Sequence, residues 1–155
     1  MFINVFLIAA CCQLNVWNGI VPLKSTRSDV EKVLGKPVAA SVGKHAAFYE
    51  TAGERVSILY STGPCTVKPS HGWNVPELAV IDILVKPHKK PNLVDFKFDM
   101  TKFERHGDPE IRGLVYYTNE EDGISITVNE TDATIEYVKY FPRLKDDRFR
   151  CPRPG

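Results

Sequence analysis

The chain has no long hydrophobic run, little cysteine and almost no net charge. No stretch of its 155 residues approaches the roughly 18 consecutive apolar residues that a membrane-spanning helix needs. A formal net charge of +1, without a concentrated basic stripe, argues against nucleic acid or another polyanion as a partner. Internal repeats, heptads and low-complexity tracts are also missing, which excludes solenoids and coiled coils.

What remains is the composition of an ordinary soluble globular protein. Apolar residues make up 43% of the chain and charged residues 25%. A chain of this length buries roughly 68–70% of its unfolded surface, so it can form a core without a metal. We expect one domain over residues 19–142, with an N-terminal segment (1–18) before it and a basic C-terminal tail (143–155) after it.

The first twelve residues, MFINVFLIAACC, form a short apolar block. This block is typical of the apolar core of an export signal. The tetrapeptide IAAC, which ends at Cys11, also fits the pattern before the acylated cysteine of a bacterial lipoprotein. No Lys or Arg precedes the block, a defect that a reading frame begun too far downstream would explain. Three alternatives stay open: a lipidated Cys11, a cleaved secreted form, and a buried first strand or helix.

Two of the four cysteines lie outside that segment. Cys65 and Cys151 form an even pair, and in an oxidising compartment a disulfide between them closes a loop of roughly 87 residues. The chain-entropy model gives such a loop about 4–5 kcal/mol of stabilisation, usually less in practice. The alternative is two unrelated thiols, one in a loop and one in the tail, because the sequence does not place their Cα atoms within bonding reach.

Residues 19–37 predict a short amphipathic helix. Ser25 or Thr26 is suited to cap its start, and Asp29 follows Thr26 at capping-box distance. One apolar stripe contains Val30, Val33 and Leu34. Gly35 and Pro37 then end the helix.

The rest of the chain reads mainly as antiparallel strands. Alternating or continuous apolar runs separated by turn residues place strands at 45–51, 54–61, 78–86, 114–118, 124–129 and 133–141. The run 78–86 is apolar on both faces except at Asp82, which favours a central position. Residues 92–105 are ambiguous, since a strand-like alternation precedes helical turns that Asp99 would cap. A phase slip within 133–141 indicates a bulge. We therefore expect an α+β fold: one short N-terminal helix packed on a curved antiparallel sheet of five to six strands.

The order of several motifs carries a resemblance. These are GIVPL-x-ST-x-x-DV-x-x-LG-x-P, YET, ERV-x-x-x-YSTGPC, GWNVP, D-x-x-K-F, YYTNEEDGI and a closing YFP…RC. Over residues 19–151 the chain resembles a family of small uncharacterised exported bacterial proteins, which implies a placement rather than an activity. At fold level, residues 26–37 are similar to the small outer-membrane assembly lipoproteins and to the β-lactamase inhibitory protein.

Groups that commonly carry chemistry are scattered. The four histidines are His45, His71, His88 and His106, and their spacings match no zinc pattern. All but His45 fall in expected loops, so we interpret them as exposed titrating groups. The carboxylates of Glu120, Glu121 and Asp122 lack the alternating ligands of a calcium loop and read as a solvated turn. No metal or cofactor is expected.

The best candidate binding surface is the loop 62–76, which contains three prolines and two glycines. Within it, Trp73 lies between residues that limit its freedom, and rigid aromatic residues on loops are over-represented at recognition hot spots. We therefore predict binding roles for Trp73, Asn74 and His71. The alternative is that Trp73 folds back over the edge of the core.

These observations predict an exported bacterial protein, periplasmic or anchored to the outer membrane through a lipid. We expect a monomeric, non-enzymatic binding or scaffold module that presents a sheet face and the Trp73 loop to a protein partner or small ligand. The alternative function is a thiol-dependent hydrolase that uses Cys65 with His71. Against it, Cys65 follows Pro64 and no helix N-terminus follows to lower the pKa of its thiol.

Overall fold

The computed structural model describes residues 15–38, 43–107 and 111–152. The predicted export segment and the lipidation site at Cys11 lie outside these residues. The described chain forms one antiparallel sheet and one α-helix, α1 (Arg27–Leu34). The strands are β1 (Ala46–Glu50), β2 (Glu54–Tyr60), β3 (Val80–Pro87), β4 (Glu104–Gly107), β5 (Leu114–Asn119), β6 (Ile124–Asn129) and β7 (Thr134–Tyr140). Three 3₁₀ turns complete it: η2 (Leu93–Asp95), η3 (Met100–Lys102) and η4 (Leu144–Phe149).

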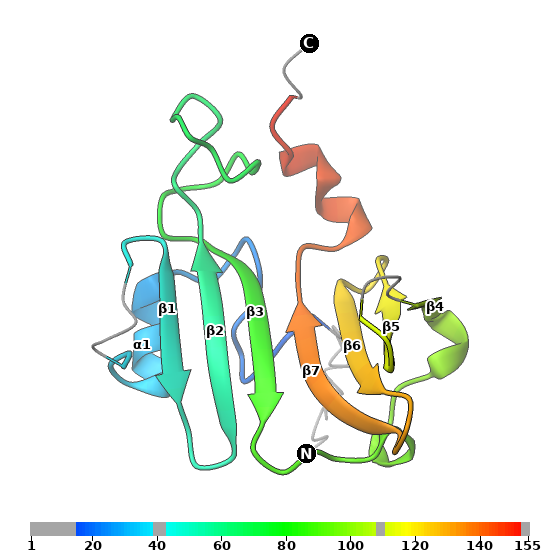
Figure 1. Cartoon of the computed structure of the whole chain (residues 1–155). Helices are drawn as coiled ribbons and strands as arrows, with labels where there is room; N and C mark the ends of the chain where they lie inside the picture. Colours follow the sequence, from blue (N-terminus) through cyan, green and yellow to red (C-terminus); the bar gives the residue numbers. More distant parts are fainter. Residues whose placement is uncertain (1–14, 39–42, 108–110, 153–155) are drawn as a thin grey trace, which may run out of the picture.

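The sheet consists of two meanders that meet through their last strands. Its order is β1-β2-β3-β7-β6-β5-β4, and every neighbouring pair is antiparallel (Figure 1). The α+β class is confirmed, but the predicted count of five to six strands is wrong, because the described residues form seven. The extra strand is β4, whose four residues are all exposed and lack an apolar alternation. It forms by pairing with β5, a long-range contact that no local pattern announces.

Helix α1 begins and ends where the sequence predicts. The Asp29 backbone N–H donates to Thr26 Oγ1, and the Thr26 backbone N–H donates to Asp29 Oδ2, at 3.3 and 3.0 Å. Gly35 ends the helix with φ +79°, a region that favours glycine. The predicted apolar stripe is too wide, since Val30 is fully buried whereas Val33 is 52% exposed. A helix of only two turns contacts the sheet along one narrow side. Val33 lies outside that side and reaches solvent.

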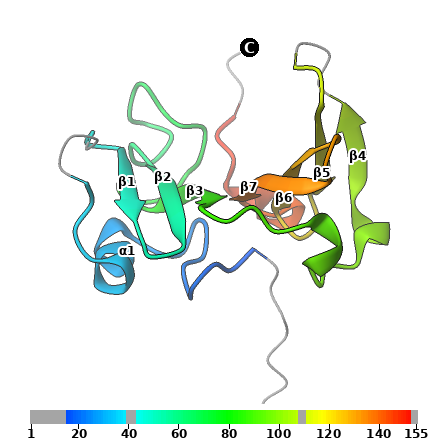
Figure 2. The same cartoon turned by 60° about the horizontal axis from the view of Figure 1, so that its bottom comes forward.

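One face of the sheet carries the core in two clusters. Under α1, buried residues of β1, β2 and β3 pack with Trp17, Ile20 and Val30. Under the segment that contains η2 and η3, buried residues of β5, β6 and β7 pack with a group of aromatic side chains. Tyr140 contacts both clusters. Figure 2 shows α1 and the η2–η3 segment on the same side of the sheet.

The ambiguous residues 92–105 resolve into turns followed by a strand. The Val94 N–H donates to Asn92 Oδ1, and the Thr101 N–H donates to Asp99 Oδ1 at the predicted cap. Phe96 and Phe98 of the strand-like run instead cover the sheet, together with Phe103 from the turns that follow. The bulge predicted within 133–141 is present. The pairing of β7 with β6 shifts register between Thr127 and Val128 of β6. Among the described residues, no helix has the length and apolar character that membrane crossing requires.

Candidate functional site: a disulfide-clamped loop beside an open sheet face

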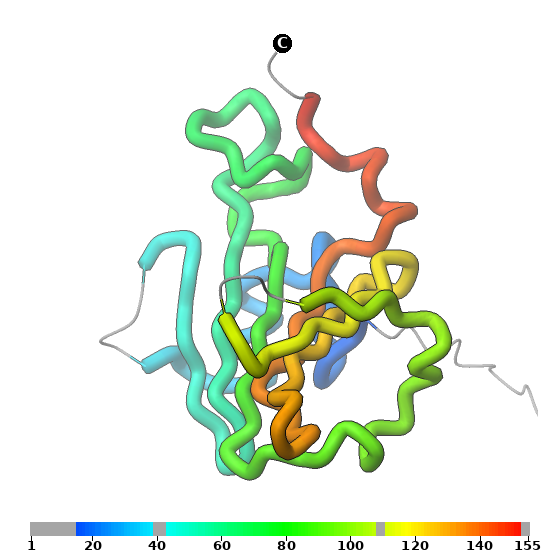
Figure 3. Tube along the Cα trace, turned by 45° about the vertical axis from the view of Figure 1, so that its right-hand side comes forward, coloured from blue at the N-terminus to red at the C-terminus, as the bar shows by residue number. Residues whose placement is uncertain are grey.

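A disulfide joins the loop between β2 and β3 to the segment after β7. Cys65 and Cys151 are bonded with their Cα atoms 5.4 Å apart, within the usual range for disulfides. Figures 1 and 3 show both segments at the same end of the sheet. The disulfide that the sequence left undecided is therefore present, and it is compatible with an oxidising compartment.

Backbone hydrogen bonds extend this clamp. The Asn74 N–H donates to the Phe149 carbonyl at 2.7 Å, and the Cys151 N–H donates to the Gly72 carbonyl at 2.9 Å. Below them Arg143 and Asp146 are both more than 90% buried and form an ion pair with an Nε–Oδ2 distance of 3.3 Å. Residues 143–152 are thus a built part of this end of the molecule rather than a loose tail.

Trp73 lies inside the clamp. It is 5% exposed and packs with Val75, Ala79 and Ile81. The guanidinium carbon of Arg150 lies 4.3 Å from the centre of its ring, a cation–π contact. The indole therefore covers the edge of the core, as the alternative reading of the sequence has it. A binding role for Trp73 stays a prediction and would act through the loop that it anchors.

Asn74 and His71 lie on either side of Trp73 in the chain and are both exposed. The Asn74 Oδ1 atom accepts a long hydrogen bond from the Cys65 N–H at 3.4 Å. The His71 Nδ1 atom lies 2.8 Å from the Tyr60 carbonyl, and its ring meets the His45 ring edge-on at 5.9 Å. Since Cys65 is bonded to Cys151, this state offers no thiol for the Cys65–His71 nucleophile of the alternative hypothesis.

His45 and His88 contact carboxylates at the surface. His45 Nε2 lies 3.2 Å from Glu77 Oε1, and Lys44 Nζ lies 2.8 Å from the same oxygen. Lys44 first and His45 second lower the pKa of Glu77. His88 Nε2 lies 2.7 Å from Glu50 Oε1, and the pKa of Glu50 is lowered mainly by Arg55. These contacts join neighbouring segments at the surface.

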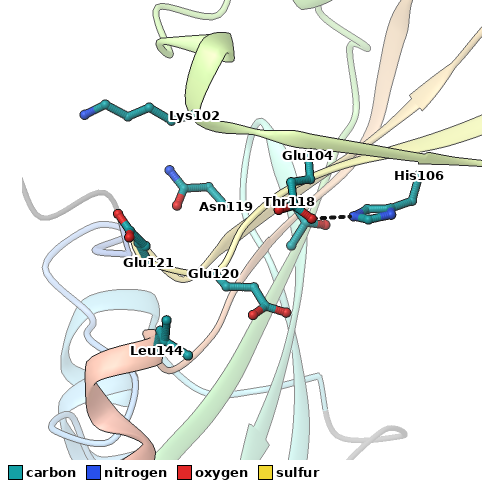
Figure 4. A pocket seen from close by; sticks show the side chains of 8 residues that line it. All are labelled: Lys102, Glu104, His106, Thr118, Asn119, Glu120, Glu121 and Leu144. Atoms are coloured by element: carbon teal, nitrogen blue, oxygen red, sulfur yellow. Dashed lines mark ion pairs between the residues drawn. The ribbon is translucent and has the colours of Figure 1, made fainter.

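A hollow of about 510 Å³ beside β4 brings together the carboxylates of the predicted turn and a histidine (Figure 4). His106 lies 3.5 Å from Glu104, but the carboxylates of Glu120 and Glu121 point in different directions. Asp122 instead bonds Asn119 within the turn. In the described part of the chain, no group of three or more histidine, cysteine or carboxylate side chains could hold a metal ion.

The face of the sheet opposite the core carries a continuous row of side chains. Cross-strand pairing aligns Phe48, Ser57, Leu84, Lys139, Ser125, Thr118 and Glu104 from β1 to β4. A second row on the same face contains His106, Tyr116, Thr127 and Tyr137. We call these two rows the open face. Phe48 is 40% exposed and Leu84 37%, so the large apolar side chains of the face reach solvent.

Sequence reasoning found part of this arrangement. The sequence places a strand at 124–129, and in the structure Ser125, Thr127 and Asn129 alternate with buried residues, which gives β6 one solvent-facing side. The rows that join strands distant in sequence were missed, because register across β3 and β7 is set by the whole sheet. The Arg150–Trp73 contact was missed as well, and no local signal would have found it. Comparisons with protein-family models, curated proteins and solved structures found no match to this chain.

Proposed function

We propose that the protein is a non-enzymatic binding module that holds a partner protein against its open face. The observation that carries this proposal is the row of seven aligned side chains across all seven strands. Six inter-strand spacings of about 4.8 Å make the row about 29 Å long. That length suits one side of a standard protein interface, which buries about 800 Å² per partner.

The chemistry of the open face favours a protein over a charged polymer. The part of the face over β5, β6 and β7 is built mainly from tyrosine, serine and threonine, residues that paratopes use for adaptable contacts at low entropic cost. Lys139 forms an ion pair with Asp82 at 3.1 Å. Lys86 Nζ lies 5.4 Å from the centre of the Tyr137 ring. Because the cations already have partners, we infer a partner surface that is close to neutral.

The shape of the face favours a macromolecule over a small ligand. Among the described residues, two hollows border the open face. The one beside Trp73 and Asp82 measures about 260 Å³, below the 300–1,000 Å³ of typical ligand pockets. The other, of about 510 Å³ beside β4, is lined by charged and polar side chains except for Leu144, whereas ligand pockets are lined mainly by apolar side chains. A broad surface whose cations are paired gains affinity from area, which a protein supplies.

Photo-crosslinking tests the proposal. A benzoylphenylalanine placed at Leu84 in the native host should give a discrete adduct with one partner protein. The matched control is the same residue at Val94, which is 85% exposed and lies away from the open face. A second substitution on the face, Thr118→Arg, should abolish the Leu84 adduct. Equal adducts from both positions, or no discrete adduct from Leu84, would contradict the proposal.

We further propose that this module works outside the cytoplasm, in the periplasm or at the outer membrane. The support is the Cys65–Cys151 disulfide together with the apolar block that ends at Cys12. The intact mass of the protein recovered from its host tests this. Loss of the residues before Cys11 with added acyl mass indicates a lipoprotein, and loss of the segment alone indicates secretion. A chain that keeps Met1 and has free thiols would contradict export.

A further inference from the structure

A groove of about 600 Å³ lies at the clamped end of the sheet and is separate from the open face. Three chain segments wall it: residues 22–24 before α1, residues 74–76 of the clamped loop, and residues 143–149 around η4. None of its lining residues belongs to the two rows of the open face. Its volume lies within the range of ligand-binding sites.

The groove has a surplus of positive charge. Lys24, Lys145 and Arg148 line it, and none of the three has a carboxylate partner among the described residues. Arg143 also lines it, but its charge is offset by Asp146. Three cations therefore remain uncompensated beside one another on a protein whose net charge is only +1.

Apolar side chains line the groove together with these cations. Leu23 lines the groove and packs against the Trp73 cluster, held with φ +63° in the left-handed region. Val75 forms part of the wall and is 7% exposed. Phe149 is 37% exposed and lies under the Arg148 guanidinium, 4.8 Å from its ring centre. A ligand that fits this surface must combine negative charge with an apolar group.

Asn74 adds a hydrogen-bond donor to the groove. Its Oδ1 atom accepts from the Cys65 N–H, whereas its Nδ2 atom has no partner among the described residues. A free side-chain amide suits the carbonyl of an extended peptide. Pro22 and Pro76, which offer no backbone N–H, stand beside it, so recognition of a peptide here relies on side chains.

We propose that this groove binds an extended acidic peptide segment in which an apolar side chain lies between carboxylates. The carboxylates face Lys24, Lys145 and Arg148, the apolar side chain packs on Leu23 and Phe149, and Asn74 donates to the peptide backbone. Charge complementarity selects this occupant. A lipid tail would need a long apolar channel, and the groove offers only short apolar walls broken by cations.

The disulfide controls the groove in this proposal. One wall is η4, which the Cys65–Cys151 bond and the Asn74–Phe149 hydrogen bond hold against the loop. Reduction of the disulfide lets that wall move, so reduced protein should bind the peptide more weakly.

Selection from a displayed library of random 12-residue peptides tests the proposal, followed by fluorescence anisotropy with the labelled winning peptide. Wild-type protein should enrich peptides with several Asp or Glu around an apolar residue. The variant Lys24→Gln/Lys145→Gln/Arg148→Gln should lose about tenfold or more in affinity. The matched control is Lys36→Gln/Lys89→Gln/Lys97→Gln, lysines outside the groove, which should bind as wild type.

Added salt and a reducing agent should each weaken binding of the winning peptide to wild-type protein. Several outcomes would overturn the proposal: no enrichment, enrichment of peptides without acidic residues, or equal losses in the two triple variants. Phosphatidylglycerol vesicles form a separate arm. Vesicle binding that the groove variant loses, without peptide selection, would point to a lipid surface and overturn the proposal. None of these measurements uses the Leu84 crosslink. They therefore test the groove proposal independently of the open-face proposal.

Discussion

Among single residues, Gly123 has the strictest local requirement. It lies at φ +66°, and a Cβ atom there would come within 2.2 Å of the Phe141 carbonyl oxygen. That oxygen belongs to backbone, and the Phe141 N–H already donates to the Gly123 carbonyl at 2.8 Å. Neither Gly123 nor Phe141 can move without breaking this hydrogen bond, which joins the start of β6 to the end of β7.

We predict that Gly123→Ala destabilises the protein by at least about 2 kcal/mol, because strain and clash add at one position. Urea unfolding followed by circular dichroism measures this. Gly53→Ala is the control, since no atom lies within 4 Å of the position that its methyl group would take and its φ is outside the left-handed region. The control should be unchanged or up to about 1 kcal/mol more stable. Equal losses in both variants would refute the argument.

Buried tyrosines give the protein a dependence on alkaline pH. Burial raises the pKa of Tyr140 to about 12, and burial followed by the Tyr49 hydroxyl raises the pKa of Tyr60 further. Burial also raises the pKa of Tyr49, whose hydroxyl lies 2.8 Å from that of Tyr60. A raised folded-state pKa contributes stability below the unfolded value near 10, and this is lost as the pH rises toward the folded value.

We therefore predict that the free energy of unfolding falls between pH 10 and 12, by about 1.4 kcal/mol per pH unit for each of Tyr60 and Tyr140, and that Tyr49 adds to the fall. Urea titrations at pH 9, 10.5 and 11.5 measure the slope. Tyr140→Phe removes one titrating group and keeps the ring in place. The slope of this variant should therefore be shallower by about 1.4 kcal/mol per pH unit. The prediction fails if the two slopes agree.

At the scale of elements, the features that the sequence predicted are those with local causes. The Thr26–Asp29 box, the Gly35 stop and the Asp99 cap each depend on residues within one turn, and all three are present. Strand β4 and the burial of Trp73 depend on partners from distant segments, β5 and the Arg150 segment. Tertiary pairing decides such features, so residues 104–107 carried no readable pattern.

The capping box yields an element-scale prediction. Thr26→Ala should cost about 1 kcal/mol, because the Asp29 N–H loses its side-chain acceptor. The bonds from the backbone and hydroxyl of Thr26 lower the pKa of Asp29 to about 2, so the loss should be present at every pH from 4 to 8. Chemical unfolding across that range measures it. Ser28→Ala in the same turn is the control and should be neutral or slightly stabilising; a loss equal to that of Thr26→Ala would contradict the assignment.

The clamp yields a second prediction at this scale. Cys65→Ser/Cys151→Ser should lower the free energy of unfolding by about 2–4 kcal/mol, since it releases a long loop. It should also expose η4, so trypsin should cut after Lys145 and Arg148 much faster than in wild type. Cleavage after Lys89, which is exposed and lies outside the clamp, is the internal control and should not change. In untreated wild type, iodoacetamide should leave the peptide that contains Cys65 unlabelled, whereas fast labelling near neutral pH would revive the thiol hydrolase.

For the molecule as a whole, the sheet is continuous but the core is divided. Strands β3 and β7 join the two meanders through three register pairs: Ile83 with Tyr140, Leu84 with Lys139, and Val85 with Val138. Tyr140 packs against both core clusters, so it links the meanders by side chain as well as by backbone. Both tryptophans belong to the meander that contains β1, β2 and β3. Tryptophan fluorescence therefore reports on that meander and, through Trp73, on the clamp with the Arg150 segment.

This division predicts how the protein unfolds when the link is weakened. In wild type, fluorescence and hydrogen exchange of the β5 and β6 amides should give the same free energy of unfolding. Tyr140→Ala removes the shared side chain, at a cost of about 3–5 kcal/mol, and should separate the two signals. Ile126→Ala is the control, because Ile126 lies in one cluster only and should lower both signals together. Coincident signals in Tyr140→Ala would show that the three backbone pairs and the Cys65–Cys151 clamp are together enough to couple the meanders, and the open face would then be one rigid surface whatever fills position 140.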